Sequence, residues 1–141
     1  MLWVKTFFGI LFQTALLGIF LYLPALTLNW PDALLFLAIH FLITILASAY
    51  LLIVKPASIE ARMNYDSKTQ PKEDRLATVL MLSAIVVGLS LAPIDIFHLN
   101  LSSSFEGNIK NIGLAIYILG MLFFMASMNA NEFAETTVTI K

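Results

Sequence analysis

The chain contains no cysteine and few charged residues, and each shortage excludes a class of function. Without cysteine there is no disulfide, no thiolate nucleophile and no cysteine-based metal site. Charged residues make up 12% of the 141 residues, against roughly 25% in typical soluble domains. The net charge of -1 provides no broad basic surface for a nucleic acid. The sequence therefore disfavours an ordinary soluble domain, and we expect no nucleic-acid partner.

Apolar residues are abundant instead, at 60% of the chain, and they gather into four long runs. The runs expected to cross a membrane as helices are 6–28, 33–54, 76–94 and 111–131. A hydrocarbon core about 30 Å thick needs roughly 20 apolar residues in a helix, so each run is long enough. None of the four contains Asp, Glu, Lys or Arg. The sequence predicts an all-α integral membrane protein with four transmembrane helices, forming a single domain over residues 1–141.

The charged residues concentrate between the second and third runs, where segment 55–75 holds nine of them. Loops rich in Lys and Arg stay in the cytoplasm, which predicts that this loop and both termini are cytoplasmic. Within the loop, residues 56–63 (PASIEARM) begin with a proline and place Ile59 and Met63 on one helical face. We expect a short helix there, lying at the membrane interface.

Candidate chemical groups are sparse, and each has two interpretations. His40 is the only Asp, Glu, Lys, Arg or His well inside a run. It is either a functional residue or a neutral histidine bonded to a neighbouring helix. Asp95 and His98 are spaced as two metal ligands, or else they mark a solvated helix end. No third ligand and no nucleophile with a base accompany them, so we expect no catalytic residue and no metal.

Two groups in the last run are candidates for a substrate path. Met121, Met125 and Met128 recur at helical spacing, and flexible thioethers suit a surface that receives a long alkyl chain. Ordinary helix packing or lipid contact is the alternative. Asn129 and Asn131 stand where this run is expected to reach the cytoplasm. They either line a polar site or cap the helix end.

Small residues form a face on each of the last two runs. In a membrane, such faces allow a neighbouring helix to approach closely. The positions are Ala84, Gly88 and Ala92 in the third run and Gly113, Gly120 and Ser127 in the fourth. Besides the lipid bilayer, the sequence therefore predicts self-association through the fourth run, whose face has room for a further helix.

Two segments resemble bacterial members of the isoprenylcysteine carboxyl methyltransferase family. Residues 55–62 (KPASIEAR), followed by 72–75 (KEDR) where a span opens, look like the cytoplasmic loop of that family. Residues 131–140 (NEFAETTVTI) are similar to the Asn-x-Phe…Val-x-Ile-Gln segment that leads out of the same span. Lys141 stands where the family usually has Gln. The likeness covers essentially the whole chain, but only the N-terminal half of the family.

The resemblance implies the membrane-anchoring N-terminal part of an S-adenosylmethionine-dependent methyltransferase in a bacterial inner membrane. Its substrate would be a lipid-like or lipidated carboxylate. The family's Gly-Pro-Tyr, Arg-His-Pro-x-Tyr and Glu-Glu motifs, which are implied to hold the cofactor and the acceptor, do not occur in these 141 residues. We therefore expect this chain alone to bind no S-adenosylmethionine and to be inactive. It would be a truncated product, or a half that needs its missing C-terminal partner.

Two other classes of function stay open. One is a small four-span transporter subunit. Multidrug exporters of that size use an acidic residue in the first span, where this chain has Gln13 and no acid. The other is a non-enzymatic lipid-binding membrane module. Such a module would show a hydrophobic groove along the three methionines of the last run.

Overall fold

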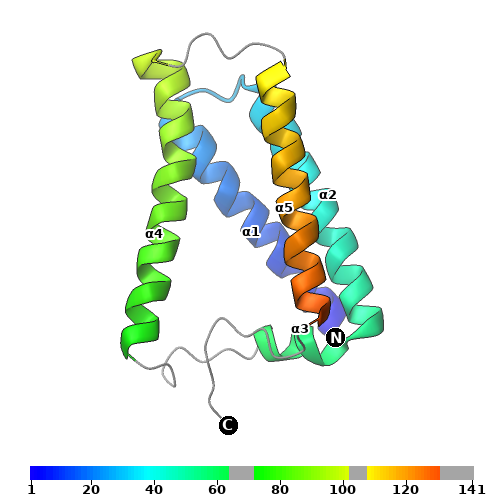
Figure 1. Cartoon of the computed structure of the whole chain (residues 1–141). Coiled ribbons are helices and arrows are strands. Elements are labelled where there is room, and N and C mark those ends of the chain that lie inside the picture. Colours follow the sequence, from blue (N-terminus) through cyan, green and yellow to red (C-terminus); the bar gives the residue numbers. More distant parts are fainter. Residues whose placement is uncertain (64–71, 102–107, 131–141) are drawn as a thin grey trace.

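The structure is a computed structural model that describes residues 1–63, 72–101 and 108–130. Its elements are the helices α1 (Leu2–Ala25), α2 (Pro31–Val54), α3 (Pro56–Met63), α4 (Lys72–Ile94) and α5 (Asn108–Ala130) and the π-helix η2 (Asp95–Leu99) (Figure 1). Four of the helices are long and apolar enough to cross a membrane. The described ranges contain no strand. The predicted all-α fold with four helices able to cross a membrane is thus confirmed.

Local sequence explains the turn between the first two spans. α1 ends at Ala25, directly after Pro24, whose ring removes a backbone donor. Leu26 follows in the left-handed conformation, with φ of 54°. α2 then starts with Pro31 at its first position and Asp32 in its first turn. A fixed φ and a negative charge both favour a helix start, so the two spans form a tight antiparallel hairpin.

The third span extends beyond its apolar run. Pro93 lies inside α4, and the chain continues as η2 to Leu99 instead of ending near residue 94. Asn100, with φ of 53°, closes this π-helix by donating its N–H to the main-chain oxygen of Asp95 at 2.7 Å. The carboxylate Oδ1 of Asp95 also accepts the N–H of Leu101 at 2.9 Å. Side chain and main chain together therefore fix this helix end.

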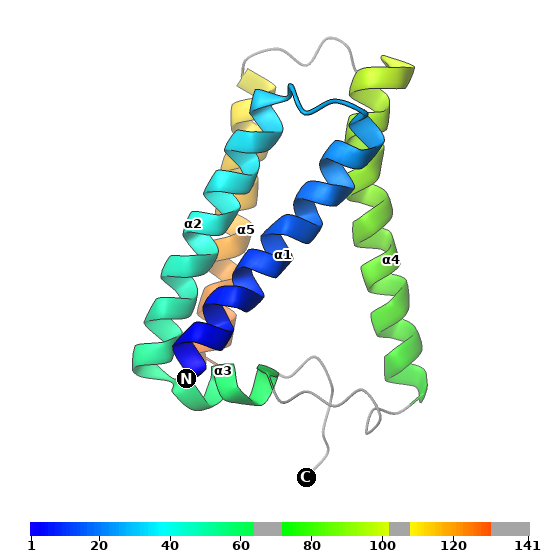
Figure 2. The same cartoon turned by 180° about the vertical axis from the view of Figure 1, so that it is seen from behind.

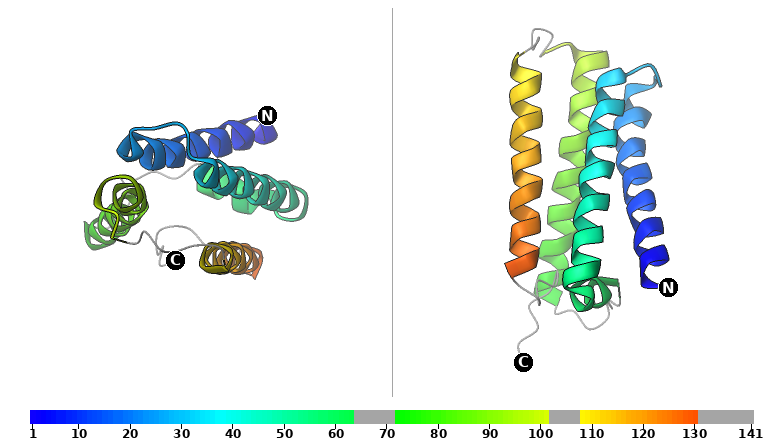
Figure 3. Two further views of the ribbon diagram at one scale, coloured as in Figure 1. Left: turned by 90° about the horizontal axis from the view of Figure 1, so that it is seen from above. Right: turned by 90° about the vertical axis from the view of Figure 1, so that its right-hand side faces the viewer.

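The helices form an open bundle. α1 runs obliquely and packs against both α2 and α4, whereas α5 packs on α2 (Figure 2). Seen from above, α1 and α2 form one side of the molecule, and α4 and α5 stand on the other (Figure 3). The start of α1 and the ends of α2 and α5 lie beside α3. This end of the molecule is the α3 end. The 26–30 turn lies at the opposite end.

Most of the molecule's apolar surface faces outward. Large apolar side chains along all the spans are exposed, Phe123 of α5 by 77%. Such a surface would be unfavourable in water, but in a bilayer it contacts lipid tails. A cluster of buried apolar residues lies at the α3 end. Its members are Leu51, Leu52, Ile59 and Met128, with Leu2 packed against them.

The glycines of the small-residue faces do not contact a neighbouring helix in the described part of the chain. A Cβ atom added at Gly88, Gly113 or Gly120 would meet nothing within 4 Å. Helix contact through these glycines is therefore absent among the described residues, since α4 packs on α1 and α5 packs on α2 through other residues. Gly120 is free to meet a further helix, whereas Gly88 and Gly113 border cavities.

Candidate functional site

A cavity of about 450 Å³ lies at the α3 end, with walls from α1, α2, α3 and α5. Small-molecule pockets in proteins span roughly 300–1,000 Å³, so its size suits a ligand. Met121, Met125 and Met128 of α5 all line it. The three methionines singled out from the sequence thus meet at one cavity. They form one apolar wall of this cavity.

A second wall carries a row of polar side chains. His40, Thr44 and Ser48 of α2 are spaced four residues apart, so they share one face of the helix, and all three line the cavity. Gln13 and Thr6 of α1 line it as well. Thr44 Oγ1 donates to the main-chain oxygen of His40 at 2.7 Å, which satisfies its hydroxyl inside an apolar span. The lining is therefore amphipathic, with methionines from α5 and polar groups from α1 and α2.

The short helix α3 forms the end wall of the cavity. Ile59 and Met63 lie four residues apart and both line it, which confirms the helix and the shared face predicted from the sequence. Ile59 also belongs to the buried cluster with Leu51. Thr6 Oγ1 lies 3.7 Å from the sulfur of Met63 and joins α1 to α3. These contacts hold the end wall against two spans.

His40 marks the other extreme of the polar row. It is 4% exposed, and its Nδ1 lies 2.5 Å from the hydroxyl oxygen of Tyr117 on α5. Phe36 packs beside this pair, with its ring centroid 4.8 Å from that of Tyr117 and 6.4 Å from that of His40. A histidine bonded to a neighbouring helix is thereby confirmed. Its Nε2, however, has no hydrogen-bond partner among the described residues.

Polar contacts also join α5 to α2 at both ends. Lys110 Nζ lies 2.6 Å from Asp32 Oδ2 at the end opposite α3. Both side chains are more than half exposed, so this ion pair contributes little in water. At the α3 end, Lys55 Nζ donates to the main-chain oxygen of Asn129 at 2.5 Å. That lysine satisfies one of the carbonyls that the last turn of a helix leaves unpaired.

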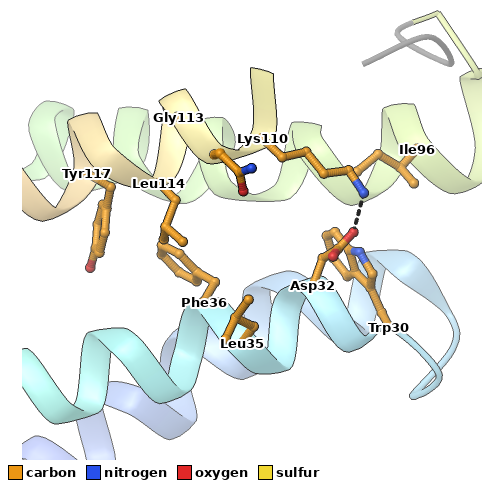
Figure 4. A pocket seen from close by; sticks show the side chains of 10 residues that line it. Trp30, Asp32, Leu35, Phe36, Ile96, Lys110, Gly113, Leu114 and Tyr117 are labelled. Carbon is orange, nitrogen blue, oxygen red and sulfur yellow. Dashed lines mark hydrogen bonds and ion pairs between the residues drawn. The ribbon is translucent and has the colours of Figure 1, made fainter. Parts of the chain in front are cut away.

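A larger cavity, of about 540 Å³, lies at the end opposite α3 (Figure 4). Trp30, Phe36 and Tyr117 line it, and the Asp32–Lys110 ion pair lies at its edge. Its charged groups already pair with each other, and none of the candidates from the sequence reaches it. The cavity at the α3 end, which combines the methionines with a polar row, is therefore the better candidate site.

The other candidates lie outside that cavity. Asn129 contributes its main-chain oxygen to Lys55, and its side chain is not part of the cavity wall. Asn131 lies outside the described residues. His98 Nε2 lies 2.7 Å from the main-chain oxygen of Pro24, so it joins η2 to the end of α1. Within the described ranges, no three residues of the types His, Cys, Asp and Glu gather as metal ligands.

Two polar residues of the α2 row were missed in the sequence. Thr44 and Ser48 continue the helical face of His40, and three hydrogen-bonding side chains on one face of an apolar span form a recognisable signal. Serine and threonine are common in membrane helices, where they often bond to their own backbone. The polar row indicates a site only when it faces the methionine wall of α5. A single sequence does not show which helices pack together, so this arrangement was not predicted.

Comparison with protein-family models, curated proteins and solved structures finds no match for this chain. The functional interpretation therefore depends on the residues and the geometry of the cavity.

Proposed function

We propose that this chain is a membrane module that holds the apolar chain of a lipid-like molecule in the cavity at the α3 end. The observation that carries the proposal is the position of the three methionines. Met121, Met125 and Met128 line the cavity and are half-buried or buried, whereas their neighbours Leu122 and Phe123 are exposed to the surrounding bilayer. Thioether side chains adapt to apolar partners of irregular shape, which suits a flexible hydrocarbon chain.

The proposal places the α3 end at the cytoplasmic face of a bacterial inner membrane. The Lys and Arg residues of the 55–75 loop support this orientation. Both chain termini are then cytoplasmic, and α3 lies at the membrane surface. The cavity then extends from the inner-leaflet side at α3 to the middle of the membrane at His40, and a lipid-like molecule can enter it from the bilayer.

In the same proposal, the bound molecule is a methyltransferase substrate, a lipid-like or lipidated carboxylate. The chain is then the membrane-anchoring N-terminal part of an S-adenosylmethionine-dependent enzyme of the isoprenylcysteine carboxyl methyltransferase type. In support, the segment that resembles that family's loop, 55–62, includes most of α3, which forms the end wall of the cavity. Methyl transfer needs the donor carbon and the acceptor oxygen aligned about 3–3.5 Å apart. We expect this chain alone to hold no cofactor in that position.

Filling the cavity tests the binding proposal. Met125→Trp places a large ring where the hydrocarbon chain would lie, so we expect the affinity for a fluorescent long-chain alcohol to fall at least tenfold. The measurement is fluorescence polarisation in alkyl-maltoside micelles. Met81→Trp is the matched control, because Met81 is 53% exposed on α4 and outside the cavity. Equal affinities for both variants and the unmodified protein would contradict the proposal.

The enzymatic part is tested with radiolabelled S-adenosylmethionine. We expect the purified 141-residue chain neither to bind the cofactor nor to methylate extracted membrane lipids. Methylated product formed by this chain alone would overturn that expectation. The binding proposal is judged separately, by the fluorescent alcohol.

A small transporter subunit is the second candidate. Cavities at both ends of the contact between α2 and α5 favour it, because a transported molecule needs access from both sides. Proton-coupled export would also need an acid inside the membrane, and α1 contains none. Proteoliposomes loaded with a cationic dye distinguish the two: dye efflux driven by a pH gradient would favour transport, and we expect none.

A further inference from the structure

His40 Nε2 is a buried polar atom that lacks a partner among the described residues. The side chain is 4% exposed and lines the cavity at the α3 end. Buried polar groups in native proteins are nearly always hydrogen-bonded, so an unmatched one needs an explanation. The other ring nitrogen, Nδ1, is already engaged by Tyr117. Nε2 is thus the ring nitrogen of this histidine that is left without a partner.

Counting hydrogen bonds assigns the tautomer of His40. If the Tyr117 hydroxyl donates to Nδ1, the ring carries its hydrogen on Nε2, and that N–H is the one donor without an acceptor. If Nδ1–H donates to the hydroxyl oxygen, both the tyrosine hydrogen and the Nε2 lone pair lack partners in the described structure. The first arrangement leaves fewer unmatched groups and is therefore favoured. It makes Nε2–H a hydrogen-bond donor.

The depth of His40 restricts what can accept that hydrogen bond. At 1.5 Å per residue, His40 lies roughly 14 Å from Pro31 and roughly 21 Å from Val54 along the axis of α2. That position is well inside the hydrocarbon region of a bilayer. A carboxylate or phosphate would lose its hydration there, whereas a neutral carbonyl oxygen accepts a hydrogen bond without bringing a charge. The acceptor is therefore neutral.

We propose that the cavity binds a molecule with a neutral carbonyl oxygen on a long apolar chain, and that His40 Nε2–H donates a hydrogen bond to this oxygen. The carbonyl belongs to an ester or to an isoprenoid quinone, since both carry this chemistry on a membrane-soluble chain. A carboxylate on the same molecule would lie at the α3 end. This inference depends on the proposed function, because it names the ligand class of the same cavity.

Nitrogen NMR of the histidine tests the hydrogen bond. The chain has two histidines, so His98→Asn leaves a single ¹⁵N-labelled imidazole to observe. The probes are a long-chain methyl ester, a short-chain isoprenoid quinone and the alkane of matched length. The protein is kept in alkyl-maltoside micelles, which contain no carbonyl group. We expect the ester, the quinone or both to shift the Nε2 resonance, and the alkane to leave it unchanged.

Competition with the fluorescent alcohol measures the affinity of the protein for each of these probes. We expect the unmodified protein to prefer the ester over the alkane by about five- to tenfold, as for one neutral hydrogen bond. His40→Leu should lose this preference and still bind the alkane, whereas His40→Gln, which keeps an N–H donor, should retain part of it. Thr14→Val is the control, because the Thr14 hydroxyl bonds to the oxygen of Ile10 and lies outside the cavity.

The outcomes separate the two proposals. A shift of the Nε2 resonance with only one of the two carbonyl probes supports the inference. It also shows whether the cavity takes an ester or a quinone. If the alkane and both carbonyl probes bind equally and Nε2 does not move, the carbonyl inference is wrong and the lipid-binding function stands. If no probe, the alkane included, competes with the fluorescent alcohol in the unmodified protein, both proposals fail.

Discussion

His40 and Tyr117 are 77 positions apart in sequence and share a hydrogen bond between two spans. Inside a bilayer, water does not compete for such a bond, although measured values average only about 0.6 kcal/mol and reach about 1.7 kcal/mol. The Tyr117 ring also packs against Phe36, so apolar contact accompanies the bond. At the scale of single residues, this pair joins the middle of α5 to α2.

Removing the tyrosine hydroxyl should therefore weaken the bundle. We expect Tyr117→Phe to lower the free energy of unfolding by about 0.5–1.5 kcal/mol, because the ring stays in place and the hydrogen bond is lost. Unfolding by SDS in mixed micelles measures the change. Tyr50→Phe is the control, since Tyr50 is 46% exposed on α2, and its effect should stay within about 0.5 kcal/mol. Equal effects of the two substitutions would show that the hydroxyl of Tyr117 contributes nothing.

At this scale, the sequence identified part of the site. His40 was found because a lone ionisable residue in an apolar span is unusual, and the methionines because they recur at helical spacing. Tyr117 was not found, since a tyrosine in a membrane helix carries no distinctive signal. Its importance comes from the approach of α5 to α2, which brings its hydroxyl to a histidine far away in sequence.

At the scale of elements, α5 is held on one side and open on another. Polar contacts join it to α2 near its start, middle and end, and the two cavities lie between these contacts. Gly120 instead has open space around it, whereas Gly113 borders the larger cavity. Small residues in membrane helices allow close backbone contact, so this face is suited to a helix of a second molecule.

Self-association through this face should depend on the size of its residues. We expect the protein to dimerise in mild detergent and Gly120→Leu to weaken the dimer at least tenfold, because a larger side chain separates the helices. Sedimentation equilibrium measures the dissociation constant. Ala115→Leu, which enlarges a residue on another face of α5, should leave it unchanged. A strictly monomeric unmodified protein would rule out this mode of association.

The spans and the cavity differ in how far the sequence predicts them. A span depends on the length and apolarity of one segment, and these are local properties, so all four spans were predicted. The continuation of the third span past Pro93 into η2 was not predicted, because it depends on how Asp95 and Asn100 close the helix end. The cavity depends on which faces of four helices meet, and the sequence pattern does not specify those contacts.

At the scale of the whole molecule, the unequal distribution of charge sets the expected orientation. The absence of cysteine makes this testable, because one introduced thiol gives one labelling site. A membrane-impermeant maleimide applied to intact spheroplasts should label Asn29→Cys, in the turn opposite α3. Ser67→Cys, in the 55–75 loop, should react only after permeabilisation. The reverse pattern would invert the topology and place the candidate cavity in the outer-leaflet half.

Photochemical labelling can show where a bound chain lies in the molecule. A long-chain methyl ester with a diazirine on its hydrocarbon chain would be bound, irradiated and mapped by mass spectrometry. We expect adducts at Met121 and Met125, and their loss in the cavity-filling variant Met125→Trp but not in Met81→Trp. Adducts confined to the outward-facing residues Leu122 and Phe123, and equal in all variants, would show that the chain lies in the surrounding micelle and not in the cavity.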